Sequence, residues 1–196
     1  MPDTNPRLLR SSDYRRMPWK NGGGETVEIA VFPEAAGLAD FDWRVSMATV
    51  ASDGPFSVFP GIDRTLSILD GQGMTLFIDG QDPVLLTVQS DPLPFAADAP
   101  TTATLSNGPI TDLNVMTRRG TLSHTVRRML LDGETRLTLD AGTTLIFCGE
   151  GTLDVRHGDD GMKLKRHDCL VFDLASSGDI SLSGVATALV IRLRKA

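Results

Sequence analysis

The stretch W-K-N-G-G-G-E-T, residues 19–26, places three glycines beside an indole, an ammonium group and a side-chain amide. Ordering glycine costs more backbone entropy than ordering any other residue, so three in a row need a reason. A chemical reason is that glycine allows close approach of the backbone, whose successive N–H groups can then hold an anion. Lys20 and Asn21 would add a charge and an amide beside Gly22 and Gly23. A flexible turn is the alternative, and the sequence lacks the G-K-[ST] of a phosphate-binding loop.

Cations are scarce in the first half of this chain of 196 residues, whose formal net charge is -6. Residues 1–118 hold 8 of the 19 Lys and Arg residues but 15 of the 25 Asp and Glu residues. This balance argues against nucleic acid or a membrane surface as the main partner. A buried arginine here would need something negative to meet it, and its planar fork suits a carboxylate.

The elements that must position these groups are strands. Residues 41–50, F-D-W-R-V-S-M-A-T-V, alternate between an apolar face with Trp43 and Val45 and a polar face with Arg44 and Ser46. If the apolar face covers the outside of a sheet or an interface, the polar face looks into a cavity. An exposed polar face is an equally good interpretation of the same pattern.

The second half of the chain repeats the first. Glycines at 71, 73 and 80 correspond to glycines at 149, 151 and 158 with one constant offset of 78 residues, and the strand order around them matches. We therefore expect a duplication with two antiparallel barrels: residues 1–118, which would hold the ligand pocket, and residues 119–196.

A strand, a G-x-G, a hairpin and another strand resemble the cupin barrel, with His167 standing where such sequences usually have glycine. The resemblance implies an all-β bicupin, two antiparallel barrels of the cupin or jelly-roll type packed together. Metal-binding cupins carry H-x-H, then a glutamate, and a glycine seven residues after that glutamate. Measured back from Gly71, the glutamate position falls on Arg64, and no histidine pair precedes it. We expect neither metal nor cofactor, and an anion at Arg64; pairing of Arg64 with an acid of the same half is the alternative.

Other chemistry is thinly represented. Cys148 and Cys169 lack a metal-like spacing and fit small buried side chains of a reduced, cytoplasmic protein. The sequence shows neither a signal peptide nor an apolar run of membrane-spanning length. No nucleophile motif or carboxylate pair is marked out, so we name no catalytic residue.

Four longer motifs carry a more specific resemblance: M-P-W-K-N-G-G-G-E-T-V-E-I (17–29), F-D-W-R-V-S-M-A-T-V (41–50), D-G-P-F-S-V-F-P-G-I-D-R (53–64) and D-L-N-V-M-T-R-R-G (112–120). With these, the chain resembles the HutD/Ves family. The resemblance implies a bicupin associated with histidine-utilisation operons, regarded as a regulator that binds a metabolite. It implies acidic ligands such as urocanate and formylated or formiminated glutamate, and it carries the family's conserved arginine onto Arg64.

The leading hypothesis is a non-enzymatic binder of a small carboxylate metabolite. The expected ligand-binding residues are Arg64, Arg44, Lys20, Asn21, Gly22, Gly23, Ser46, Ser57, Trp19 and Phe56. A metal-independent enzyme acting on such an intermediate is the first alternative. A protein-interaction module, whose partner could be a second copy in a homodimer, is the second.

Overall fold

The computed structural model describes residues 6–19, 22–173 and 176–196, and the chain divides into two compact units. The first, here called the site unit, comprises Arg15–Ser123 with the terminal Ala196. The second unit comprises His124–Lys195 with the described part of Met1–Tyr14. The described residues contain strands and one short 3-10 helix but no α-helix, which confirms the all-β prediction. They also contain no helix long and apolar enough to cross a membrane.

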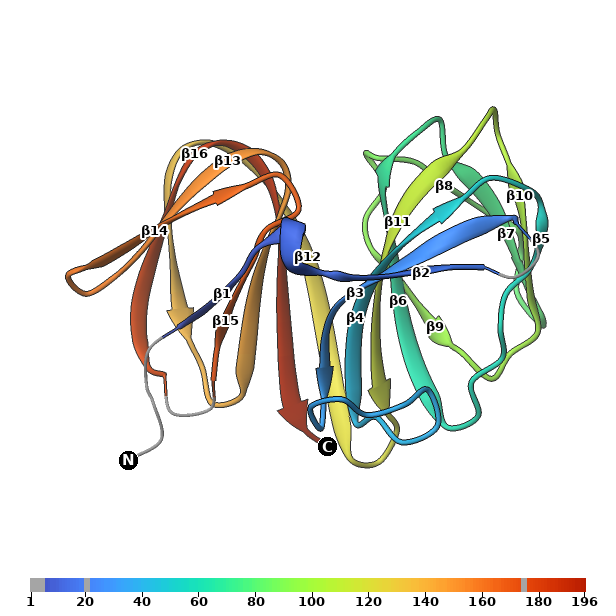
Figure 1. Ribbon diagram of the computed structural model, residues 1–196, viewed down its shortest axis with the longest axis horizontal. Coiled ribbons are helices and arrows are strands. Elements are labelled where there is room, and N and C mark those ends of the chain that lie inside the picture. Colours follow the sequence, from blue (N-terminus) through green and yellow to red (C-terminus); the bar gives the residue numbers. More distant parts are fainter. Residues whose placement is uncertain (1–5, 20–21, 174–175) are drawn as a thin grey trace. The chain divides into compact units, whose positions relative to one another are not determined.

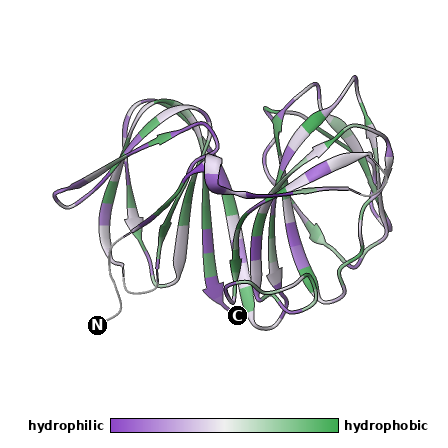
Figure 2. Ribbon diagram, viewed as in Figure 1, coloured by the Kyte–Doolittle hydropathy of each residue, from purple (hydrophilic) through white to green (hydrophobic). Residues whose placement is uncertain are grey.

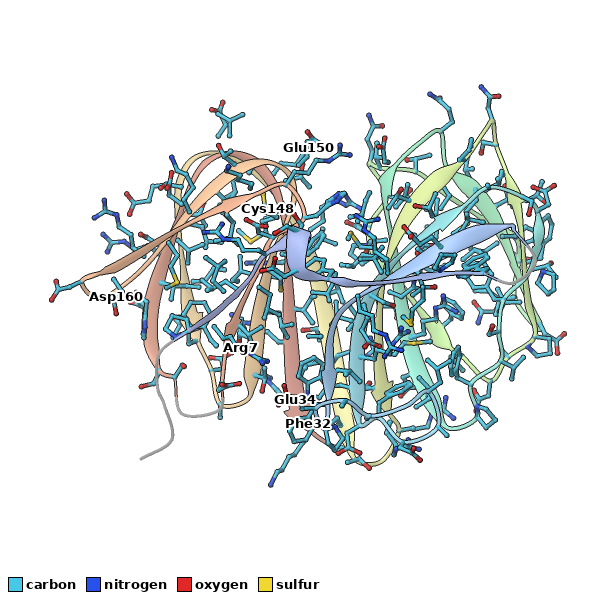
Figure 3. The ribbon with its side chains drawn as sticks, in the orientation of Figure 1. Arg7, Phe32, Glu34, Cys148, Glu150 and Asp160 are labelled. Atoms are coloured by element: carbon cyan, nitrogen blue, oxygen red, sulfur yellow. The ribbon has the colours of Figure 1, made fainter. Side chains whose placement is uncertain are left out.

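The site unit is a sandwich of two antiparallel sheets (Figure 1). Its six-stranded sheet has the order β2 (Arg15–Pro18), β3 (Gly24–Phe32), β4 (Trp43–Val50), β11 (Ile110–Arg118), β6 (Ile62–Asp70), β9 (Leu93–Ala96). Its four-stranded sheet has the order β5 (Gly54–Pro55), β10 (Thr101–Leu105), β7 (Met74–Ile78), β8 (Val84–Leu86). One apolar cluster draws buried side chains from both sheets, including Ile68, Leu76 and Ala103. Side chains fill the space between these sheets (Figure 3).

The second unit is built around one six-stranded antiparallel sheet. Its order is β1 (Arg7–Leu9), β15 (Cys169–Phe172), β13 (Thr143–His157), β16 (Gly178–Lys195), β12 (Leu122–Leu139), with β14 (Asp160–Lys165) paired to β13. Its buried cluster is apolar throughout and includes Leu153, Leu164, Phe172 and Leu182. Hydrophilic and hydrophobic residues alternate along the strands (Figure 2), the period-two pattern of a sheet with one buried face.

The first described strand, β1, belongs to the second unit, whereas the sequence-based division put all of residues 1–118 together. Strand β1 pairs with β15, with Leu8 opposite Leu170. Arg10, just before the 3-10 helix η1 (Ser11–Asp13), donates to the Asp168 carboxylate at 2.7 Å, and the Tyr14 hydroxyl donates to the His167 carbonyl at 2.9 Å. These contacts are long-range in sequence, which is why local patterns did not reveal them.

The strand register supports the duplication. In the site unit Asp112 pairs with Ile68, and in the second unit Val190 pairs with Ile146; both partners are displaced by the same 78 residues. Gly73 and its counterpart Gly151 both have positive φ, at 101° and 79°. His167 also has a positive φ, 68°, which explains why glycine is the residue expected there.

Both cysteines are buried free thiols. The Cys148 thiol lies against the carbonyls of Glu150 and Gly151 at a bulge in β13, and burial raises its pKa to about 11. Cys148 is buried while Glu150, two residues on, is exposed (Figure 3). These positions agree with the interpretation of both cysteines as buried small side chains.

The two glycines of the β6–β7 and β7–β8 turns offer a test of the turn geometry. A Cβ on Gly73 would lie 2.3 Å from the Leu86 carbonyl oxygen, whereas one on Gly80 would meet nothing within 4 Å. Both residues have positive φ, so alanine costs about 1–2 kcal/mol at either site. We expect Gly73→Ala to destabilise the protein by clearly more than Gly80→Ala, as measured by urea unfolding. Equal losses would show that the close approach at Gly73 is relieved without cost.

Candidate functional site

A cavity of about 690 Å³ opens within the site unit and is lined by residues of β2, β4, β6 and β11 and the segment after β5. Arg44 and Ser46 on β4 line it, together with Arg64 on β6 and Asp112 and Asn114 on β11. The polar face of residues 41–50 therefore looks into a cavity, one of the two alternatives that the sequence left open. Trp43, Val45 and Met47 on the opposite face of β4 are all buried.

Antiparallel register brings the two arginines to the same level of the sheet. On the central strand β11, Met116 pairs with Arg44 on one side and with Arg64 on the other. Asn114, two residues along, points to the same face because side chains alternate along a strand. Arg44 and Arg64 are 20 residues apart in sequence, but in the sheet only strand β11 lies between them.

Arg64, Asp112 and Asn114 form a polar layer, here called the belt, between two apolar clusters. Along β11, Ile110 belongs to the main cluster of the sandwich and Met116 to a second cluster with Phe41 and Ile62. Asp112 and Asn114 lie between them on the same face. Burial of polar groups in such a place is costly unless they bond to one another.

Arg64 is held at the centre of the belt. Its Nε donates to the Asn114 side-chain oxygen at 2.7 Å, and its Nη2 donates to the same oxygen. Its guanidinium carbon lies 4.6 Å from the centroid of the Phe56 ring and 5.7 Å from that of Phe95, both within cation–π range. Among the residues that the structure describes, no carboxylate forms an ion pair with Arg64. Burial lowers the pKa of Arg64 to about 10; nearby Asp112 opposes this effect and Arg44 adds to it.

Asp112 is the buried acid of the belt, with 1 % of its surface exposed. Its Oδ1 accepts a hydrogen bond from the Asn114 amide at 2.5 Å, and the Ala48 backbone N–H also supports it. Burial raises the pKa of Asp112 to about 6, against the lowering effect of Arg64 and of these two hydrogen bonds. Asn114 therefore fixes Arg64 through its oxygen and Asp112 through its nitrogen.

Arg44 differs from Arg64 because it has a carboxylate partner. Its Nε donates to Glu28 on β3 at 2.8 Å, and its Nη1 lies 3.4 Å from the Ser46 hydroxyl. Arg44 is 5 % exposed, and its ion pair with Glu28 compensates its buried positive charge. The more available of the two guanidinium charges is that of Arg64.

The remaining candidates divide into three groups. Trp19, Phe56 and Ser57 line the cavity; the Trp19 indole N–H donates to the Thr26 hydroxyl at 2.8 Å. Gly22 and Gly23 form the β2–β3 turn: the Gly22 N–H donates to the Trp19 carbonyl and the Gly23 carbonyl accepts from Ala51, and neither glycine is among the described lining residues.

Lys20 and Asn21 lie outside the described residues. The third glycine has a packing role, because a Cβ on Gly24 would lie 2.1 Å from the Thr49 carbonyl oxygen and 3.0 Å from the Trp19 ring. The close approach at Gly24 is thus one packing reason for glycine in this stretch.

Four residues of the site were not singled out from the sequence: Asp112, Asn114, Glu28 and Phe95. The signal for the first two was present, because D-L-N-V alternates buried polar with apolar residues in a strand. Within the described part of the chain, no group of three His, Cys, Asp or Glu side chains is placed to hold a metal ion.

Two jelly-roll units in one chain define a bicupin, and solved structures of low identity share this fold: YhhW from Escherichia coli superposes with a TM-score of 0.70 at 10 % identity.

 That superposition covers 98 % of this chain and 99 % of YhhW, and at such low identity it shows the fold alone.

The family follows from closer relatives. The chain matches the HutD family over residues 11–190, and it belongs to that family. It is 37 % identical over 165 residues to an uncharacterized 21.2 kDa protein in the hutC 3′ region of Pseudomonas putida, covering 84 % of this chain and 85 % of that protein. It is 43 % identical over 120 residues to Protein Ves of Citrobacter koseri, covering 59 % and 61 % of the two chains.

A solved structure supports the same assignment. HutD from Pseudomonas fluorescens SBW25 superposes with a TM-score of 0.85 at 34 % identity, covering 98 % of this chain and 100 % of that one. The sequence-based assignment to the HutD/Ves family is confirmed, and with it the association of this family with the histidine-utilisation locus.

The buried acid of the site makes a pH-dependent stability prediction. The pKa of Asp112 in the folded protein lies above its ordinary value, so the stability that its protonated form provides is present at low pH and is lost as pH rises through about 6. Between pH 5 and pH 8 we expect the wild type to lose roughly 1.5 kcal/mol more unfolding free energy than Asp112→Asn.

Urea unfolding followed by tryptophan fluorescence measures this difference, since both tryptophans, Trp19 and Trp43, belong to the site unit. Asp91→Asn, at an exposed position, is the matched control and should follow the wild type. Parallel pH profiles for wild type and Asp112→Asn would contradict the prediction.

Proposed function

We propose that this protein is a cytoplasmic, non-enzymatic regulator of histidine utilisation that binds a carboxylate-bearing pathway intermediate through Arg64. The observation that carries the proposal is the state of Arg64: it lines the cavity, is fixed by a neutral amide, and has no ion-pairing carboxylate among the described residues. A guanidinium in that state can donate two parallel hydrogen bonds to a carboxylate from the N–H groups that Asn114 does not occupy.

The rest of the cavity fits a small, partly apolar acid. Its volume of about 690 Å³ lies within the range of small-molecule sites. Phe56 and Trp19 supply an apolar wall, and the Ser46 and Ser57 hydroxyls supply orienting hydrogen bonds. Urocanate and formylated or formiminated glutamate have this chemistry, and the hut-associated relatives make them the first candidates.

Calorimetric titration of metal-stripped protein with urocanate, formylglutamate, formiminoglutamate and glutamate tests the proposal. We expect one of these acids to bind the wild type, and Arg64→Ala to weaken it by about 1.5–3 kcal/mol, roughly tenfold to hundredfold. Arg16→Ala is the matched control, because Arg16 is an exposed arginine of the same unit that pairs with Glu25. No binding of any acid, or equal binding by wild type and Arg64→Ala, would remove Arg64 from the site. Chemical conversion of the bound acid would favour the alternative hypothesis, a metal-independent enzyme, over a regulator.

A second variant tests the role of the neutral amide. Asn114→Asp keeps the shape of the side chain but places a carboxylate directly against Arg64. We expect it to bind the same acid at least tenfold more weakly at neutral pH, because the guanidinium charge is then already paired. Undiminished affinity in this variant, measured by the same titration, would show that the charge of Arg64 does not drive binding.

A further inference from the structure

Two arginines line the cavity, and their nearest acids are arranged unequally. Arg44 and Glu28 touch each other at 2.8 Å and form a closed pair. Arg64 and Asp112 do not touch, because the Asn114 amide stands between them. Asp112 is therefore the distant counter-ion of Arg64, and this pair is the only one of the two that leaves a guanidinium accessible to a ligand.

An anion bound at Arg64 would change the charge balance of this second pair. Arg64 would then interact with two negative groups, the bound anion directly and Asp112 across the Asn114 amide. Two anions that share one buried cation raise the free energy of each other's charged form. Asp112 has 1 % of its surface exposed, and its hydrogen bonds come from two neutral donors, the Asn114 amide and the Ala48 N–H.

We propose that binding of a carboxylate at Arg64 is coupled to the uptake of one proton by Asp112, so that affinity rises as pH falls. The proton comes from solvent and converts the Asp112 carboxylate to the neutral acid, which restores the charge balance of the cavity. This inference rests on the proposed function, since it requires that Arg64 receive an anion.

The groups around Asp112 are consistent with this coupling. Arg64 on β6 is the charged group that acts on Asp112 directly, and β11 itself contributes the Asn114 amide. Strand β4 contributes the Ala48 N–H, and its charged residue Arg44 is bound to Glu28 of β3. Burial already raises the pKa of Asp112 to about 6 without a ligand, so a further rise brings its titration towards neutral pH.

The test uses formate as the probe, because formate stays ionised throughout the pH range in which Asp112 titrates. The pH titration of the Asp112 carboxyl carbon is followed by NMR in the full-length protein, with formate and with sodium chloride at equal ionic strength. Asp112→Asn identifies the resonance, and Arg64→Met removes the anion site. The Asn114 side-chain amide resonances report formate binding independently.

We expect formate to raise the midpoint of the Asp112 titration in the wild type and to leave it unchanged in Arg64→Met. Each unit of rise corresponds to a tenfold gain in formate affinity between alkaline and acidic pH. Saturable formate binding with an unchanged Asp112 midpoint would overturn the coupling and leave the proposed function standing. Absence of formate binding at Arg64 would overturn the carboxylate site and the coupling together.

Discussion

The site depends on keeping a guanidinium buried without placing a carboxylate directly on it. Desolvation opposes the charged form of Arg64, and a direct ion pair such as that of Arg44 with Glu28 would offset this at the cost of accessibility. Here the charge of Arg64 is compensated by the Asn114 amide oxygen, by two aromatic rings and by the Asp112 carboxylate, which lies on the other side of the Asn114 amide. Such an arrangement requires three neighbouring strands in fixed register, which is what the β4–β11–β6 order provides.

The duplicated scaffold shows that the cavity comes from side chains and not from the fold. At the positions related by 78 residues, the second unit has Val190 in place of Asp112 and Arg192 in place of Asn114. Val190 joins an apolar cluster, and Arg192 pairs with Asp140 at 2.7 Å. The same strand geometry thus supports a filled core in one unit and a polar cavity in the other.

Much of this could be predicted from local sequence. Alternation along residues 41–50 placed Arg44 and Ser46 on one face but left open whether that face is exposed or lines a cavity, and the glycine spacing led to Arg64 and to the duplication. The Arg64–Asn114 contact joins residues 50 apart, and Arg44–Glu28 depends on a bulge in the pairing of β3 with β4. Such contacts follow from register, which a single strand does not specify. For the G-G-G stretch, the described contacts show a backbone hydrogen bond from Gly22 to Trp19 and close packing of Gly24 under the Trp19 ring, and neither is evident from composition.

The pairing of β1 with β15 has a consequence for the order of events during synthesis. Apart from Ala196, the site unit is continuous from Arg15 to Ser123, so all of its strands have emerged before most of the second unit is made. The second unit must wait for Cys169–Phe172 before Arg7–Leu9 finds its partner, and closing so long a loop is slow. Domains generally fold as units during vectorial synthesis, N-terminal ones first. The nascent chain can therefore form the cavity of the site unit while strand β1 is still unpaired.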